Sequence, residues 1–320
     1  MKLIKSNVEE WHCGYTLPEI WAHIAKCARV CYQSEPRKNG ETDEEFVKRV
    51  ILRNHSLEEI GESRELQLKL HLSVLEQGTV YLDIPYLANK ERLCVFFSNT
   101  YSRFKCYKIE DSSDTYNIAI TTNMRVIIEN GRIDLLKYIC APTKYHCLRT
   151  SFSIITDIGI ARELARHRTH SISEESTRYC NYSKDKFGNE LTFVKPEWLD
   201  MYDEDEGREV TRDWNFDVLD GCAIIAEESK FDDARDAYLT SISVAEHCYK
   251  ELLENGWTPQ QARQILPLST KVQTIHTAFN SDWDEFISLR ADGCSGSVHP
   301  NMKVIANKIK SLMSKENATN

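Results

Sequence analysis

The sequence has no Cys-x-x-Cys pair, no Gly-rich phosphate loop and no apolar run long enough to cross a bilayer. Without Cys-x-x-Cys, the eleven cysteines do not suggest a zinc ribbon, although His12, Cys13 and Cys147 stay open as zinc ligands. The missing loop argues against the common dinucleotide and P-loop sites. The N-terminal stretch has no apolar leader, so we expect a cytoplasmic protein with reduced thiols, no membrane partner and no resident metal.

Positive charge is also scarce. Lys and Arg number 40 against 49 Asp and Glu, which gives a net charge of −9. This balance argues against a protein that binds a nucleic acid polymer through its phosphates. A small anion remains a candidate ligand, because a local basic cleft can focus the field inside an acidic protein.

The distribution of apolar residues predicts an α+β fold with an antiparallel or mixed sheet flanked by helices. Helices are expected at 19–34, 258–267, 282–292 and 300–313, and residues 209–255 are expected to form one long helical stretch or two. Strands are expected at 78–87, 150–156 and 271–279, with strand-to-helix changes at Asn123 and Asp157. We predict one domain over 1–320 with insertions at about 56–70 and 86–115 and a helical C-terminal part.

The segment RHRTHSISEESTRY, residues 166–179, has no apolar periodicity and gathers cations, hydroxyls and carboxylates. A helix dipole alone would explain two basic residues at the end of the preceding helix, but not the polar residues that follow. Guanidinium and hydroxyl groups together suit phosphate oxygens. Glu174 and Glu175 would orient the arginines, or accept from the amide and sugar hydroxyls of a nucleotide. The pattern favours an anion site over a solvated polar loop.

This segment resembles the signature of flavin-dependent thymidylate synthases, which is Arg-His-Arg, seven residues, Ser, and then Arg-Tyr two positions later. The stretches ITDIGIARELARHR, PTKYHCLR, GWTPQQARQILPLS and LRADGCSGSVHPNM resemble the branch common in some bacteria and phages. The resemblance covers most of residues 1–312 in the same order. It implies that family's fold, a homotetramer with shared active sites, and a location in the host cytoplasm if the chain is phage-encoded.

The resemblance also implies an activity. The family makes dTMP from dUMP, with methylenetetrahydrofolate as the carbon donor and FAD reduced by NADPH as the hydride source. The residues implied to bind dUMP are Glu163, Arg166, Glu174, Ser176, Arg178, Arg263 and Arg290. Among them, Arg290 and Ser176 would polarise the pyrimidine and are the catalytic candidates. The residues implied to contact FAD are Thr79, Arg166, His167, Arg168, Glu174, Asn280 and His299.

Three departures from the family lie on the flavin side. Gln77 stands where the family has a histidine, Phe279, Asn280 and Ser281 replace Asn-x-Arg, and the segment between Arg290 and His299 is longer than usual. Asn280 could replace the family's asparagine if the alignment is shifted by one residue. Two alternatives therefore stay open: a related flavin and folate enzyme that leaves another group, such as hydroxymethyl, on C5 of dUMP or dCMP, and a non-catalytic nucleotide-binding relative.

Overall fold

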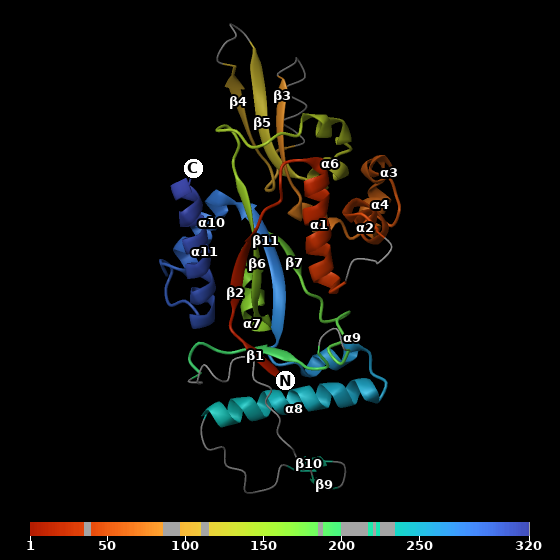
Figure 1. Ribbon diagram of the computed structural model, residues 1–320, viewed down its shortest axis with the longest axis vertical. Coiled ribbons are helices and arrows are strands. Elements are labelled where there is room, and N and C mark those ends of the chain that lie inside the picture. The colour runs from red at the N-terminus through yellow and green to blue at the C-terminus, as the bar shows by residue number, and fades with distance from the viewer. Residues whose placement is uncertain are drawn as a thin grey trace.

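The computed structural model describes residues 1–34, 40–85, 97–109, 115–184, 188–199, 217–219, 222–224 and 234–319. Its centre is a four-stranded antiparallel sheet in the order β2-β6-β11-β7 (Figure 1). The strands are β2 (Asn7–Trp11), β6 (Arg149–Asp157), β11 (Lys271–Phe279) and β7 (Ser171–Glu174). Smaller sheets are β3-β5-β4 (Thr79–Pro85, Tyr116–Asn123, Arg103–Lys108) and the parallel pair β1-β8 (Lys2–Ile4, Thr192–Val194). The predicted α+β class is confirmed.

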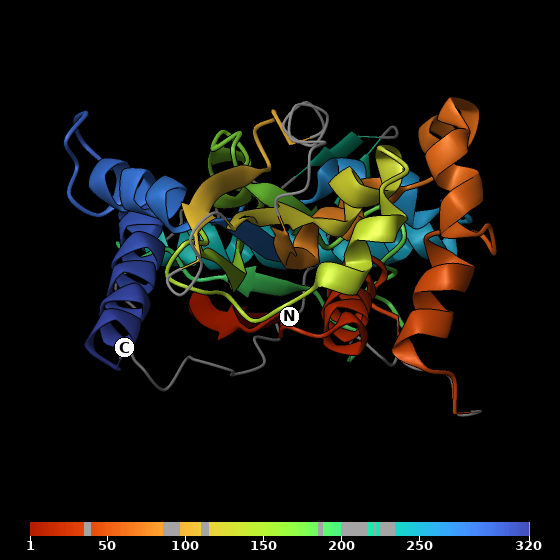
Figure 2. The ribbon, with the colours of Figure 1, turned by 90° about the horizontal axis from the view of Figure 1, so that it is seen from above.

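Helices cover both faces of the central sheet. One core contains Ile275 of β11 and apolar residues of α1 (Leu17–Tyr32), α2 (Asp43–Val50) and the three-stranded sheet. The opposite core contains Ala278 and apolar residues of α7 (Ile158–Leu164), α10 (Asn280–Arg290) and α11 (Pro300–Thr319). Because side chains alternate between the two faces of a strand, β11 contributes Ile275 to one core and Ala278 to the other. Figure 2 shows α2 and α10–α11 on opposite sides of the sheets.

Local sequence signals set the ends of several elements as predicted. Thr16 and Glu19 form a capping box at the start of α1, and Ile24 and Cys27 lie on its buried face. Asn123 ends β5 and accepts a hydrogen bond from Val126 N, which begins α6 (Met124–Glu129). Both strand-to-helix changes that the sequence indicates are therefore confirmed, since Asp157 caps α7 in the same way.

The prediction of one or two helices over 209–255 is right for α8 (Ala234–Glu254) and wrong for its first part. Residues Asp217–Leu219 (β9) and Cys222–Ile224 (β10) form an antiparallel pair, and residues 209–216, 220–221 and 225–233 lie outside the described residues. The sequence carries a signal for this outcome, because an Asp-Gly pair stands between two short apolar runs, as is typical of β-hairpins.

The remaining elements are short. Residues 56–70, expected to be an insertion, contain α3 (Leu57–Glu62) and α4 (Arg64–Lys69). The second expected insertion includes β4, but residues 86–96 and 110–114 lie outside the described residues. The other elements are η1 (Leu72–Gln77), η2 (Ile133–Tyr138), α9 (Pro259–Ala262) and η5 (Arg263–Ile265).

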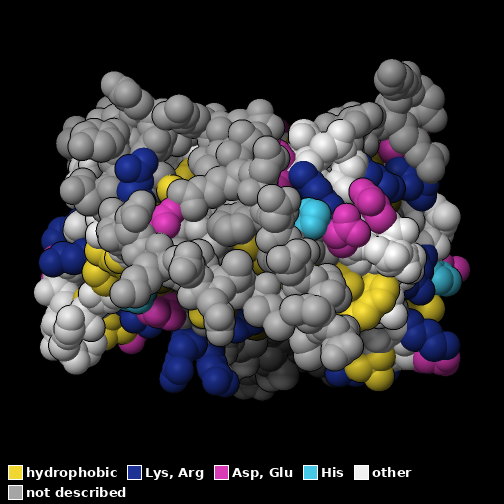
Figure 3. All heavy atoms as spheres, turned by 90° about the horizontal axis from the view of Figure 1, so that it is seen from below, with side chains coloured by type: hydrophobic (Ala, Val, Ile, Leu, Met, Phe, Trp, Pro, Cys, Tyr) yellow, Lys and Arg dark blue, Asp and Glu magenta, His cyan; other side chains and the backbone are white. Residues whose placement is uncertain are grey.

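The helix α8 crosses one end of the molecule (Figure 1) and packs on a third core with Tyr182, Phe193 and Leu3. Figure 3 looks onto this end, where side chains of both charges and some apolar groups are visible among the described residues. Within the described part of the chain, no helix is both long enough and apolar enough to span a membrane.

Buried histidines make the fold sensitive to acid. His276 and His170 are buried with their Nδ1 atoms 3.4 Å apart, beside Trp283. Burial lowers the pKa of His276 to about 3 and that of His170 to about 2. Charge repulsion from His167 lowers both pKa values further, and repulsion from His276 also lowers that of His170. Both are therefore neutral in the folded protein at pH 5, whereas the unfolded chain binds protons below about pH 6.5.

We expect the free energy of unfolding to fall as the pH drops from about 6.5 towards the folded pKa values. One such histidine removes about 2 kcal/mol between pH 7 and pH 5. His276→Gln should narrow the difference between the urea midpoints at pH 7 and pH 5. The control His12→Gln changes a histidine whose side chain is 78% exposed and should leave that difference unchanged. Equal narrowing in both variants would contradict the assignment.

Candidate functional site

The Arg-His-Arg segment follows directly on α7. Asp157 begins this helix by accepting from Ile160 N at 2.7 Å, and its other carboxylate oxygen accepts from Asn301 Nδ2 at 3.1 Å. The helix ends at Leu164, whose side chain is buried in the core. Because the last turn is fixed by this packing, Arg166 and Arg168 are left exposed while His167 turns partly inward.

Arg290 meets this segment at the C-terminal end of α10. Its Nε donates to His167 Nε2 at 3.2 Å, and its Nη1 lies 3.3 Å from the Glu163 carboxylate. Burial, followed by the charge of Arg290, lowers the pKa of His167 to about 4. The imidazole is thus neutral at pH 7 and accepts the hydrogen bond, so it orients the guanidinium without cancelling its charge. The structure brings together three residues that the sequence singles out.

Two further arginines, Arg178 and Arg263, lie at the turn that follows the strand β7. Arg178 donates through Nε and Nη2 to Gln260 Oε1 at 3.0 and 2.8 Å, and Arg263 Nη1 donates to Thr177 Oγ1 at 3.3 Å. Among the described residues, neither guanidinium forms an ion pair. Neutral partners hold the arginines in place and leave their charge available for an anion.

Ser176 lies in the same turn, and its backbone fixes the turn against α1. Its N–H donates to Cys31 O at 3.0 Å, and its Oγ accepts from Arg178 N at 3.4 Å. In the described structure no base contacts Ser176 Oγ, which agrees with a binding role rather than a nucleophilic one.

The expectation that Glu175 orients arginines is wrong. Its buried carboxylate instead accepts from Lys271 Nζ at 2.7 Å and from Tyr182 OH at 3.2 Å. This contact ties the turn to β11. Glu174 ends β7, and its pKa is raised by desolvation and by the neighbouring Glu175, while Arg162 lowers it.

The expected flavin residues do not meet in one place within the chain. Thr79 is buried at the start of β3, where its Oγ1 accepts from Arg149 Nη1 at 3.2 Å. Asn280 begins α10 and accepts from Thr150 Oγ1 at 2.8 Å, so it lies about 15 Å along the helix from Arg290. His299 precedes α11 and contacts the ring of Trp198.

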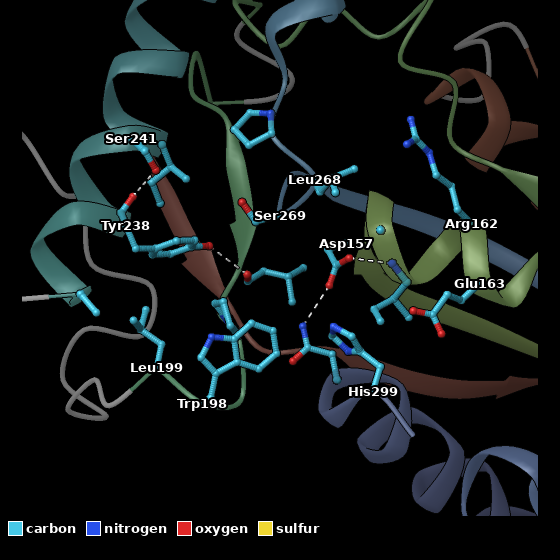
Figure 4. A pocket seen from close by; sticks show the side chains of 18 of the residues that line it. Asp157, Arg162, Glu163, Trp198, Leu199, Tyr238, Ser241, Leu268, Ser269 and His299 are labelled. Atoms are coloured by element: carbon cyan, nitrogen blue, oxygen red, sulfur yellow. Dashed lines mark hydrogen bonds between the residues drawn. The ribbon is translucent and has the colours of Figure 1, made fainter. Parts of the chain in front are cut away.

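A cavity of about 1090 Å³ lies on the outer side of α7 (Figure 4). Arg162 and Glu163 of α7 line it together with Trp198, Tyr238 and His299. Glu163 thus lines this cavity and also contacts Arg290. In the described residues, no group of three or more His, Cys, Asp or Glu side chains is placed to hold a metal ion. His146 has structural contacts to Thr143 N and Leu82 O.

The sequence reasoning missed Gln260, which holds Arg178, and Arg149, which contacts Thr79. Nothing in the helix pattern around Gln260 marks it as a partner. For Arg149 a signal was available, because this arginine precedes seven strand residues that are all apolar or hydroxyl-bearing.

Comparisons with known proteins agree with the motif. The model of the family described as thymidylate synthase complementing protein matches residues 84–317. A flavin-dependent thymidylate synthase of Thermosipho africanus is 29% identical over 150 residues, which are 47% of this chain and 58% of that protein. The chain therefore matches less than two thirds of that relative's length. A probable flavin-dependent thymidylate synthase of Paramecium bursaria Chlorella virus 1 is 26% identical over 189 residues, 57% of this chain and 75% of that protein.

Among solved structures, the UMP/dUMP methylase PolB of Streptomyces cacaoi bound with 5-Br dUMP is similar to this chain with a TM-score of 0.39 and 17% identity. That alignment covers 98% of this chain and 93% of PolB. The family match spans more than two thirds of the sequence and includes the Arg-His-Arg segment and Arg290. The chain belongs to the thymidylate synthase complementing protein family.

Proposed function

We propose that this chain is a flavin-dependent thymidylate synthase that makes dTMP from dUMP, with methylenetetrahydrofolate as carbon donor and NADPH-reduced FAD as hydride source. The contact of Arg290 with neutral His167 and with Glu163 carries the proposal. Uracil C5 is a weak nucleophile that gains strength when negative charge on the N3 and O4 edge is stabilised. A guanidinium with a fixed orientation supplies that stabilisation without a proton transfer of its own.

The two arginines beside Ser176 complete the nucleotide side. Arg178 and Arg263 would bind the dUMP phosphate, because both retain their charge and offer donors to an anion. Ser176, Glu163, Arg166 and Glu174 would contact the sugar and the pyrimidine. A small acidic protein thus gains an anion site from a few local cations.

The flavin would be held by Thr79, Arg166, His167, Arg168, Glu174, Asn280 and His299. The residues present suit a phosphate-bearing cofactor, because Thr79 contacts the buried guanidinium of Arg149, whose Nε has no hydrogen-bond partner among the described residues. FAD supplies the hydride when it is bound. Within one chain, Asn280 begins α10, whereas His167 contacts Arg290 at the other end of this helix. This separation supports sites shared between subunits of a homotetramer. Sedimentation as a monomer with FAD bound would contradict the shared sites.

A second candidate is a related flavin and folate enzyme that leaves another one-carbon group, such as hydroxymethyl, on C5. Gln77 favours it. This residue is fully buried, donates to Ser171 O at 3.1 Å and accepts from the hydroxyl of Thr277. Its amide is therefore committed to the protein, whereas the family's histidine at this position lies close to the flavin.

Arg178→Ala should remove most of the thermal stabilisation that dUMP gives to the protein, because the phosphate loses a charge-assisted partner. Arg64→Ala is a matched control, since Arg64 is likewise an arginine bonded to a glutamine, Gln67. Melting curves with and without dUMP test the prediction. A shift that is unchanged in Arg178→Ala would remove this residue from the nucleotide site.

Arg290→Lys keeps the charge but loses the planar fork. We expect the single-turnover rate of dTMP formation on reduced enzyme to fall about 100- to 1000-fold, while flavin reduction by NADPH changes far less. Arg132→Lys, at an arginine paired with Asp134 away from the site, is the control. Equal rates in wild type and Arg290→Lys would exclude Arg290 from the chemistry.

A further inference from the structure

Arg149 is a buried cation that forms no ion pair within the described part of the chain. It begins β6, and only 8% of it is exposed. Its Nη atoms donate to neutral acceptors, namely Glu76 O at 3.4 Å, Thr79 Oγ1 at 3.2 Å and Ser171 Oγ at 3.1 Å. Among the described residues, no carboxylate lies within ion-pair distance, and its Nε is buried without an acceptor. Burial of an unpaired charge is costly, so this arrangement favours an anionic ligand.

A second arginine lies on the same aromatic ring. The guanidinium of Arg103, from β4, is 4.5 Å from the ring centroid of Phe279, and that of Arg149 is 5.6 Å from it. Arg103 donates to Thr100 O and Ser102 O, both at 3.0 Å. It has no ion pair within the described part of the chain either. Two guanidinium groups with only neutral hydrogen-bond partners therefore lie around one side chain.

Phe279 is also the N-cap of α10, and its side chain gives no cap to the helix. The N–H of Asn280 donates to Leu148 O, so the N–H groups of Ser281 and Asp282 and the positive end of the helix dipole are what the helix offers beside the two arginines. The first turn contains one carboxyl group, Asp282, whose Oδ2 is buried without a hydrogen-bond partner among the described residues. Burial raises the pKa of Asp282, while Arg103 and Arg149 lower it. The charge of Glu76 also acts on Arg149, but this carboxylate pairs with Arg125. Asp282 alone does not balance two guanidinium groups and a helix end.

We propose that Arg103, Arg149 and the N-terminus of α10 bind a phosphate or diphosphate group. Guanidinium forks and helix N–H groups are donors suited to phosphate oxygens. Thr79, one of the expected flavin contacts, is hydrogen-bonded to Arg149. The group is thus assigned to the diphosphate of FAD, an assignment that rests on the proposed function. A free phosphate or pyrophosphate has the same chemistry and is the other source to be distinguished.

The test is calorimetric titration of the flavin-free full chain with FAD, riboflavin and pyrophosphate. Arg103 is partly exposed at the edge strand β4, so Arg103→Gln should fold. We expect this variant to bind FAD and pyrophosphate about tenfold or more weakly, with unchanged affinity for riboflavin, which has no phosphate. Arg132→Gln, at an arginine paired with Asp134, should bind all three probes as the wild type does.

A second variant removes the opposing charge. Asp282→Asn should raise the affinity for pyrophosphate several-fold, because the anion no longer meets a carboxylate. If the arginines serve only to neutralise Asp282, the affinity will not rise, and that result overturns the proposal. FAD that binds equally to wild type and Arg103→Gln also overturns it, while the proposed function stands. Pyrophosphate binding that is lost in Arg103→Gln, without any flavin binding to wild type, supports the phosphate site and contradicts the proposed function.

Discussion

The antiparallel pairing of β6 with β11 is the constraint on which the site depends. Their register runs from Asp157 opposite Lys271 to Arg149 opposite Phe279. At one end β6 continues into α7 and the Arg-His-Arg segment, and at the other end β11 continues into α10. Because α10 packs back along the sheet in the same core as α7, its last residue, Arg290, reaches His167. A shift in this register would separate the two halves of the contact.

The arginines of this protein are held in two different ways. Surface arginines such as Arg49 and Arg132 pair with carboxylates. Arg178, Arg263 and Arg149 instead donate to amide, hydroxyl or carbonyl oxygens. Neutral partners fix the orientation of a guanidinium without compensating its positive charge. An anion site in an acidic protein requires such a charge. The proposed binding sites therefore depend on the neutral hydrogen-bond partners of these arginines and not on the net charge of the protein.

Periodicity and capping residues predicted the strands β6 and β11 of the central sheet and the helices beside them, but not the edge strands β2 and β7. Asn123 and Asp157 mark strand-to-helix changes because their side chains satisfy helix N–H groups, and this information is local. The β9–β10 pair was missed because a charged, mixed segment was interpreted as helix despite its Asp-Gly pair.

The site was less accessible to sequence reasoning. The motif identified Arg166–Arg168 and Ser176, but the partners Gln260 and Arg149 are distant in sequence from the residues they hold. No local pattern encodes such contacts. The role expected for Glu175 was wrong for the same reason, since its partner Lys271 comes from a strand 96 residues away.

The most direct test of the account is product analysis with reduced wild-type protein. The purified chain is reduced with NADPH in the absence of oxygen and mixed with methylenetetrahydrofolate, with and without dUMP, while the flavin absorption is followed. The account predicts a flavin band that NADPH bleaches and that returns rapidly only with dUMP, together with dTMP as the product. A flavin that reoxidises no faster with dUMP, or a nucleotide product with a different group on C5, would contradict it.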